Sequence, residues 1–208
     1  MTLTPSSTLR NHWWWRPGWS VGRRFYTWHL TWGGQDDVHR LAAEYRDALA
    51  PYAGELTLIP DRWLHLTMQG IGFVGEVAER DVRAVVDAAS ERLAAVPAFD
   101  VRVGPHVLAP EAVLLPVQPG GSVDAVRGAV RGAIGDVLGK VPESATGFRP
   151  HVSVAYSASD GPAAPVEGAL AAREFSPARA RVSSAELIVI HRDNEMYEWE
   201  TFATVPLG

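Results

Sequence analysis

Two short stretches of the chain alternate between apolar and more polar residues, which is the pattern of a strand with one buried face. In the first stretch His65 and Thr67 share the more polar face, and leucine side chains lie on the other. In the second stretch His151 and Ser153 share a face in the same way. Because side chains two positions apart on a strand point in the same direction, each stretch presents one imidazole beside one hydroxyl. This is the only internal echo that we find in the sequence.

The same periodicities predict the other elements. Strands are expected at residues 25–32, 55–59, 63–68, 99–103, 107–108, 113–117, 150–155, 180–191 and 196–205. Apolar residues spaced three and four apart predict amphipathic helices at residues 36–50, 76–95, 123–139 and 166–173. The Pro/Gly-rich run at 119–122 is expected to separate two lobes, with Ser122 capping the helix that follows. The small-residue loop 157–165 is expected to form a mobile rim beside the second motif.

This order of elements predicts an α+β fold. Two lobes, each with a mostly antiparallel sheet flanked by helices, would place the two histidine strands face to face across a central cleft. We therefore expect residues 24–208 to form a single two-lobed domain. Residues 1–23 would form a separate, tryptophan-rich arm whose first residues are loosely held.

The composition limits the functions that the chain can perform. Of 208 residues, 47% are hydrophobic and 21% are charged, which is enough apolar material for a sizeable core. The absence of cysteine excludes disulfides, thiolate metal sites and a cysteine nucleophile. The formal net charge of −5 argues against binding to duplex DNA, which needs many phosphate contacts. It leaves room for a small or single-stranded phosphate ligand in a local basic pocket.

The chain begins without the charged and apolar segments of a signal peptide. Its apolar runs are also too short to span a bilayer. From these features and the lack of cysteine we expect a cytoplasmic protein without membrane contact, and a monomer.

Residues 12–19 hold four of the eight tryptophans and include the turn Pro17-Gly18. One interpretation is an aromatic flap that stacks nucleic-acid bases at the cleft. The other is a plug that covers a hydrophobic seam between the lobes. The second is favoured, because large aromatic side chains contribute most when they are buried.

The two motifs read HLTM (65–68) and HVSV (151–154), and both fit the pattern His, apolar, Thr or Ser, apolar. The second copy extends to FRPHVSVA (148–155). This pair resembles the two-histidine phosphoesterase superfamily, in particular its RNA 2',5'-ligase-like and cyclic phosphodiesterase members. The resemblance covers residues 24–206 as a pattern of elements, and it implies a bilobal, pseudo-twofold fold with one motif in each lobe. Tyr156 departs from the pattern, since many relatives carry Arg there.

Opening a 2',3'-cyclic phosphate needs a base toward water and an acid toward the leaving sugar oxygen, and two imidazoles can supply both. The hydroxyls of Thr67 and Ser153 can donate to the non-bridging phosphate oxygens. The resemblance suggests His151 as the base and His65 as the acid, with the roles reversed in ligation. No cofactor or metal is expected, because the sequence lacks the ligand spacing of a catalytic zinc site.

The predicted function is thus a metal-independent phosphodiesterase acting on a 2',3'-cyclic phosphate or a 2',5' linkage in a nucleotide or RNA end. His29, Arg149 and Tyr156 are further candidates for substrate contact. His29 looks into the cleft if its strand pairs beside His65; otherwise it is a hydrogen-bonded histidine on a sheet face.

Other interpretations are open. Either motif histidine alone would be read as a satisfied sheet histidine, and only the pair with its hydroxyls favours a site. The departure at Tyr156 and the acidic balance motivate a second hypothesis, a module that binds a nucleotide or RNA end without turnover. A third hypothesis is a structural interaction protein that uses the tryptophan-rich arm.

Overall fold

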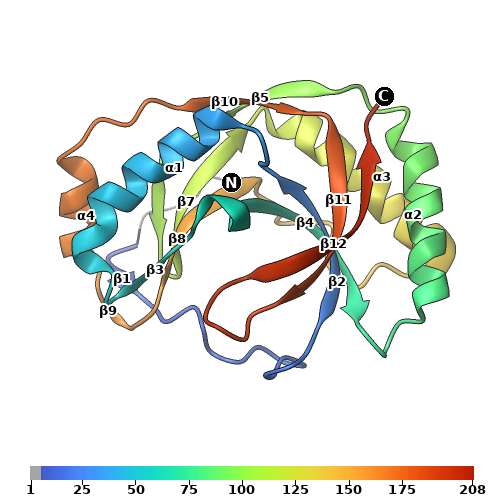
Figure 1. The fold of residues 1–208 in the computed structure, drawn as a ribbon, viewed down its shortest axis with the longest axis horizontal. Coiled ribbons are helices and arrows are strands. Elements are labelled where there is room, and N and C mark those ends of the chain that lie inside the picture. The colour runs from blue at the N-terminus through green and yellow to red at the C-terminus, as the bar shows by residue number, and fades with distance from the viewer. Residues whose placement is uncertain (1–5) are drawn as a thin grey trace.

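The computed structural model describes residues 6–208 and contains two main antiparallel sheets, each covered by two helices (Figure 1). The four-stranded sheet has the order β12 (Glu198–Pro206), β11 (Ser184–His191), β2 (Phe25–Thr31), β4 (His65–Phe73). The six-stranded sheet has the order β10 (Ala178–Val182), β5 (Phe99–Val103), β7 (Ala112–Gln118), β8 (His151–Ser157), β3 (Leu56–Leu58), with β6 (Val107–Ala109) paired to β7. The expected α+β fold with two antiparallel lobes is therefore confirmed, and each lobe contributes one motif strand.

Each of the helices α1 (Asp36–Leu49) and α3 (Gly120–Leu138) packs on the sheet that does not contain the motif strand following it in sequence. The helix α1 precedes the first motif strand, β4, in sequence but packs on β8 and β10 of the other sheet. Conversely, α3 precedes the second motif strand, β8, but packs on β4. Figure 1 shows α1 with α4 (Ala164–Ala171) at one side and α3 with α2 (Glu79–Leu93) at the other. This exchange is the pseudo-twofold relation that the resemblance implied.

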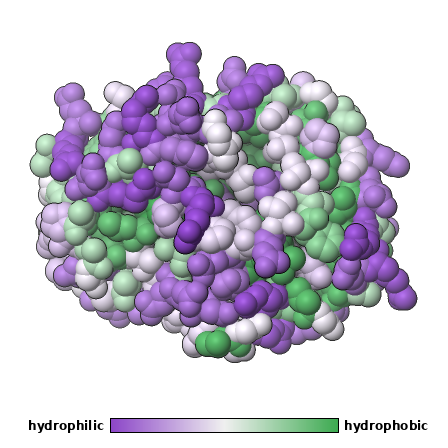
Figure 2. All heavy atoms as spheres, viewed as in Figure 1, coloured by the Kyte–Doolittle hydropathy of each residue, from purple (hydrophilic) through white to green (hydrophobic). Residues whose placement is uncertain are grey.

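The predicted helix faces form the core. All five apolar positions of the stripe predicted for α1 are buried: Val38, Leu41, Ala42, Tyr45 and Leu49. On strand β2 the predicted apolar face is buried too, with Trp28 at 0% exposure. The more polar face of this strand is also enclosed, because it faces the cleft between the lobes. Figure 2 shows that hydrophilic residues cover much of one outer face, with hydrophobic residues exposed only in separate areas.

Three local predictions were wrong. Ser122 does not cap the helix that follows the run 119–122: α3 starts at Gly120, directly after an extended Pro119, and Ser122 lies inside its first turn. Proline lacks a backbone N–H, and the N–H groups at a helix start have no partner within the helix, so proline is well tolerated at this position. The run itself connects β7 of the six-stranded sheet with a helix that packs on β4 of the four-stranded sheet. The single strand expected at 180–191 is two strands, β10 and β11, which belong to different sheets.

The third wrong prediction concerns the start of the N-terminal arm. The short strands β1 (Thr8–Leu9) and β9 (Gly161–Pro162) pair with each other, so the start of the arm and the loop after β8 are tied together. Backbone pairing thus holds residues 8–9, part of the start that composition predicted to be loose. The mobility of the rim at 157–165 stays a prediction. Residues 1–5 of the predicted arm lie outside the described part of the chain. Two short 3₁₀ helices, η1 (Ala50–Tyr52) and η2 (Asp61–Trp63), complete the fold.

Candidate active site

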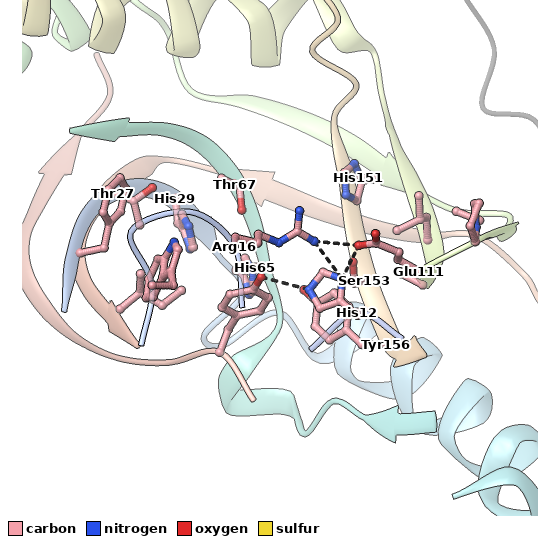
Figure 3. A pocket seen from close by; sticks show the side chains of 18 of the residues that line it. His12, Arg16, Thr27, His29, His65, Thr67, Glu111, His151, Ser153 and Tyr156 are labelled. Carbon is pink, nitrogen blue, oxygen red and sulfur yellow. Dashed lines mark hydrogen bonds and ion pairs between the residues drawn. The ribbon is translucent and has the colours of Figure 1, made fainter. Parts of the chain in front are cut away.

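A cavity of about 720 Å³ lies between the two sheets and is lined by both motifs. His65 and Thr67 reach it from β4, and His151 and Ser153 from β8 (Figure 3). Ser153 is buried, whereas Thr67 is exposed to the cavity. The four side chains that the sequence singled out therefore converge on one space, although their strands belong to different sheets.

The two motif histidines are held by the same hydrogen bond. His65 Nδ1 lies 2.8 Å from the carbonyl oxygen of Trp63, and His151 Nδ1 lies 2.7 Å from that of Arg149. A carbonyl oxygen can only accept, so Nδ1 carries the proton in each neutral ring. Nε2 of each imidazole is then left with its lone pair, which fixes the tautomer that can accept a proton.

The local sequence explains this bond. Each histidine is the first residue of its strand, and the residue two positions earlier lies outside the strand, so its carbonyl is not used in the sheet. Trp63 ends the short helix η2, and Arg149 stands before Pro150, which favours extended backbone at the residue before it. In both motifs the chain therefore turns into the strand with a carbonyl facing the imidazole.

Burial controls the protonation of these rings. The pKa of His65 is lowered to about 4, mainly by burial and to a smaller extent by the nearby His151, while the bond to the Trp63 carbonyl opposes the shift. Burial also lowers the pKa of His151, against the opposing bond to the Arg149 carbonyl. Both rings are consequently neutral in the free protein at neutral pH, and both can accept a proton.

His29 lies directly against His65. The two rings stack with centroids 4.5 Å apart and an angle of 8° between their planes. His29 is 1% exposed, and its Nδ1 has no hydrogen-bond partner among residues 6–208. Burial, and secondarily His65, lower the pKa of His29 well below its usual value. Its strand β2 pairs with β4, which is the condition under which the sequence placed His29 at the cleft, and the ring lines the same cavity.

The other two candidates for substrate contact have different positions. Tyr156 lines the cavity, but it is 5% exposed and its ring is covered by His12, with the ring centroids 4.2 Å apart. Arg149 is not among the described residues that line the cavity; its carbonyl orients His151 instead. A direct contact of the Arg149 guanidinium with a ligand in this cavity therefore stays a prediction without geometric support.

A buried arginine of α3 connects the two motif strands. Arg127 is 8% exposed, and its Nε donates to the carbonyl of Met68 in β4 at 2.8 Å. Its terminal nitrogens donate to the carbonyls of Ser144 at 2.9 Å and Ala145 at 3.0 Å, in the loop that leads to β8. One side chain thus fixes the backbone near both motifs. The apolar stripe predicted for this helix did not indicate that Arg127 is buried.

The arm supplies residues that the sequence did not single out. His12 and Arg16 line the cavity together with Glu111, which lies between β6 and β7. Trp19 lines it as well, with its ring 5.6 Å from that of Phe25. Trp13 is buried at 7% exposure, as the plug interpretation expected, but Trp14 and Trp15 are 50% and 46% exposed, so only part of the tryptophan cluster is a plug. Arg16 stands among the tryptophans of residues 12–19, and no local pattern distinguishes it from a surface arginine.

The fold and the paired motifs are those of a two-histidine phosphoesterase. The family model described as the 2'-5' RNA ligase superfamily matches residues 34–194, and the chain belongs to that superfamily. No curated protein sequence matches the chain. No helix among residues 6–208 has both the length and the apolar character needed to cross a membrane.

Solved structures agree on the fold. TT0787 of Thermus thermophilus has 17% identity and a TM-score of 0.65, over 89% of this chain and 97% of that chain. E. coli LigT complexed with 3'-AMP has 14% identity and a TM-score of 0.64, over 89% of this chain and 98% of that chain. The MHV ns2 PDE domain has 13% identity and a TM-score of 0.55, over 81% and 99% respectively. At these identities the similarity shows the fold alone.

Proposed function

We propose that this protein is a metal-independent phosphodiesterase that hydrolyses 2',3'-cyclic phosphates in nucleotides or RNA ends. Reversible formation and breakage of 2',5' linkages would use the same groups. The observation that carries the proposal is the repeated arrangement of His65 and His151. Each has Nδ1 bonded to the carbonyl two residues earlier, and both line one cavity together with a hydroxyl.

The chemistry needs two proton transfers. One neutral imidazole takes a proton from water through Nε2 as the water oxygen attacks phosphorus. The other imidazole, in its protonated form, gives a proton to the sugar oxygen as the P–O bond breaks. The product is a phosphate monoester and a free hydroxyl, and the two rings exchange their protonation states. The hydroxyls of Thr67 and Ser153 donate to the non-bridging oxygens, where negative charge increases.

The low pKa values of the free protein fit this cycle when a substrate is bound. A phosphodiester carries one negative charge, and an anion close to an imidazole favours its protonated form. Binding therefore raises the pKa of the ring that must serve as the acid. The resemblance suggests His65 for that role in hydrolysis and His151 as the base.

The cavity suits a nucleotide in size and lining. Its volume of about 720 Å³ is within the range of small-ligand sites, roughly 300–1,000 Å³. Trp19, Phe25 and Tyr197 line it, and aromatic rings of this kind can stack a nucleobase. LigT has been solved with 3'-AMP and with ATP, which supports a nucleotide ligand for this chain as well.

The test is turnover of nucleoside 2',3'-cyclic phosphates in the presence of EDTA, with the position of the product phosphate read by NMR. We expect steady conversion to one monophosphate isomer. Tight binding of the cyclic nucleotide with no product after long incubation would instead support the binding module, and would contradict the enzymatic proposal. RNA oligomers ending in a cyclic phosphate or containing a 2',5' linkage extend the assay to larger substrates.

A further inference from the structure

The motif side chains alone provide little positive charge for a phosphate ligand. Two neutral imidazoles and two hydroxyls line the centre of the cavity, and Tyr156 stands where the family pattern often has an arginine. We propose that Arg16, carried into the cavity by the N-terminal arm, is the residue that binds the substrate phosphate. This inference rests on the proposed function, because it assigns the phosphate contact of the same site.

The arm is held by both lobes as it approaches Arg16. The backbone N–H of His12 donates to the carbonyl of Ser157 in β8 at 2.8 Å, and Trp13 Nε1 donates to Thr57 of β3 at 2.9 Å. From the other lobe, Nη2 of Arg192 donates to the carbonyl of His12 at 2.9 Å. The segment before Arg16 therefore has a defined path across the cleft rather than a free one.

His12 orients the acidic partner of Arg16. Burial, and then Arg16, lower the pKa of His12 to about 4, so its ring is neutral. Its Nδ1 lies 3.0 Å from Glu111 Oε2, and its Nε2 lies 3.0 Å from the hydroxyl of Tyr197. A carboxylate oxygen accepts, so Nδ1 of His12 donates to Glu111 and the Tyr197 hydroxyl donates to Nε2. Both nitrogens of this ring are thereby satisfied.

Glu111 holds one nitrogen of the guanidinium and leaves Nη1 available. Nη2 of Arg16 donates to Glu111 Oε2 at 2.7 Å, and the Arg16 side chain stays 36% exposed. Its Nε is enclosed and has no hydrogen-bond partner among the described residues, and Nη2 also lies 3.4 Å from His12 Nδ1, so Nη1 is the nitrogen left for a ligand. A guanidinium has five N–H donors, so one carboxylate contact leaves donors for the oxygens of a phosphate. In Figure 3 the Arg16 side chain lies between the two motif strands, pointing from the arm into the pocket.

Arg16 supplies the positive charge that Tyr156 does not supply at its own position. Because the Tyr156 ring stacks under His12, at an angle of 18° between the planes, this position supports the arm instead of carrying a charge. The arm in turn brings a guanidinium to the cavity from outside residues 34–194, the part of the chain that matches the superfamily. Arginine is well suited to the role, because its planar fork can bind two phosphate oxygens at once.

The experiment measures binding rather than turnover, so that it is independent of catalysis. Isothermal titration with inorganic phosphate and with adenosine 2'-monophosphate compares wild type, Arg16→Gln and Arg16→Lys. Arg40→Gln is the matched control, because Arg40 is an exposed residue of α1 that pairs only with Asp37 at 3.1 Å in the described part of the chain. Thermal unfolding of each variant checks that the fold is retained, and kcat and KM are measured for whichever variants turn over.

We expect Arg16→Gln to weaken binding of both probes by about tenfold to a hundredfold, the effect of losing a charge-assisted hydrogen bond. Arg16→Lys keeps the positive charge but loses the planar guanidinium, so its affinity for both probes should fall between those of wild type and Arg16→Gln. Arg40→Gln binds like wild type. Equal affinity in wild type and Arg16→Gln, or equally weak affinity in Arg16→Lys and Arg16→Gln, would overturn the assignment of Arg16. A wild type that binds both probes but has no turnover would contradict the proposed enzymatic function and leave this assignment standing.

Discussion

The imidazole rings of His29 and His65 are stacked, 4.5 Å apart and within 8° of parallel. His29 is enclosed in the sheet and leaves its Nδ1 without a hydrogen bond among residues 6–208, so it contributes a flat surface rather than a fixed polar contact. The hydrogen bond from Nδ1 to the Trp63 carbonyl orients the His65 ring, and the stacked His29 ring limits the rotation of His65. We infer that His29 acts on the reaction by positioning His65.

Substitution of His29 separates this positioning role from direct substrate contact. His29→Ala removes a buried ring, which should cost about 3 kcal/mol of unfolding free energy and lower kcat because His65 loses its support. His29→Phe keeps a flat ring and removes an unpaired polar atom, so it should retain most of the activity. Urea unfolding and steady-state kinetics measure both effects. An inactive but stable His29→Phe would mean that the imidazole itself contacts the substrate.

The pH dependence of the reaction follows from the enclosed histidines. Activity needs one neutral and one protonated ring, and in the free protein the pKa of each lies below 6.5, with that of His65 at about 4. The form with one neutral and one protonated ring is lost above the higher pKa, where the acid is deprotonated. It is also lost below the lower pKa, where the base is protonated. We therefore expect kcat/KM to be greatest below pH 6.5.

The profile of kcat should differ, because it reports on the complex. The bound phosphodiester anion raises the pKa of the imidazoles, so the maximum of kcat should lie at higher pH than that of kcat/KM. Initial rates from about pH 4 to about pH 8 at several substrate concentrations give both profiles. A maximum of kcat/KM above about pH 7 would show that the histidines are not desolvated as the structure indicates.

Arg127 should hold β4 in place against the loop that leads to β8. Its guanidinium donates to Met68 in β4 and to two carbonyls before β8, so Arg127→Met leaves three backbone acceptors without this partner. We expect a loss of about 3 kcal/mol in unfolding free energy, together with a lower kcat. Arg83→Gln is the control, since its exposed pair with Glu79 should be worth less than about 0.5 kcal/mol. A wild-type stability for Arg127→Met would contradict this account.

The roles of acid and base can be assigned with an activated substrate. In bis(p-nitrophenyl) phosphate the leaving group needs no proton, so loss of the acid matters less than loss of the base. The resemblance predicts that His65→Ala keeps a larger share of wild-type activity on this ester than His151→Ala does. On a cyclic phosphate both variants should be strongly impaired. The opposite ranking on the activated ester would assign the acid to His151.

The sequence predicted what depends on local pattern. Alternation placed His65 and Thr67 on one strand face and His151 and Ser153 on another, and the apolar stripe of α1 is buried as expected. These predictions succeed because a strand or helix fixes the direction of its own side chains. The order of the elements predicted the two lobes and the resemblance implied the same arrangement, which the strand order confirms.

Alternation says which face a side chain is on, but not which segment lies opposite. The break at Ser183, where the chain passes from one sheet to the other, is marked only by a pair of serines. Arg127 stands beside apolar neighbours on α3, and its burial depends on carbonyls 17 and 59 residues away. Arg16 reaches the cavity because the arm crosses both lobes. Contacts of this range depend on the assembled fold, so local pattern could not reveal them.

The most direct test of the central claim compares His65→Ala, His151→Ala and the double variant on a nucleoside 2',3'-cyclic phosphate in EDTA. Each single variant should keep its fold and lose about 10²- to 10⁴-fold in kcat/KM, the usual contribution of a general acid or base. Because the two rings act in one step, the double variant should lose much less than the product of the two single losses. Turnover unchanged in either single variant would contradict the two-histidine mechanism.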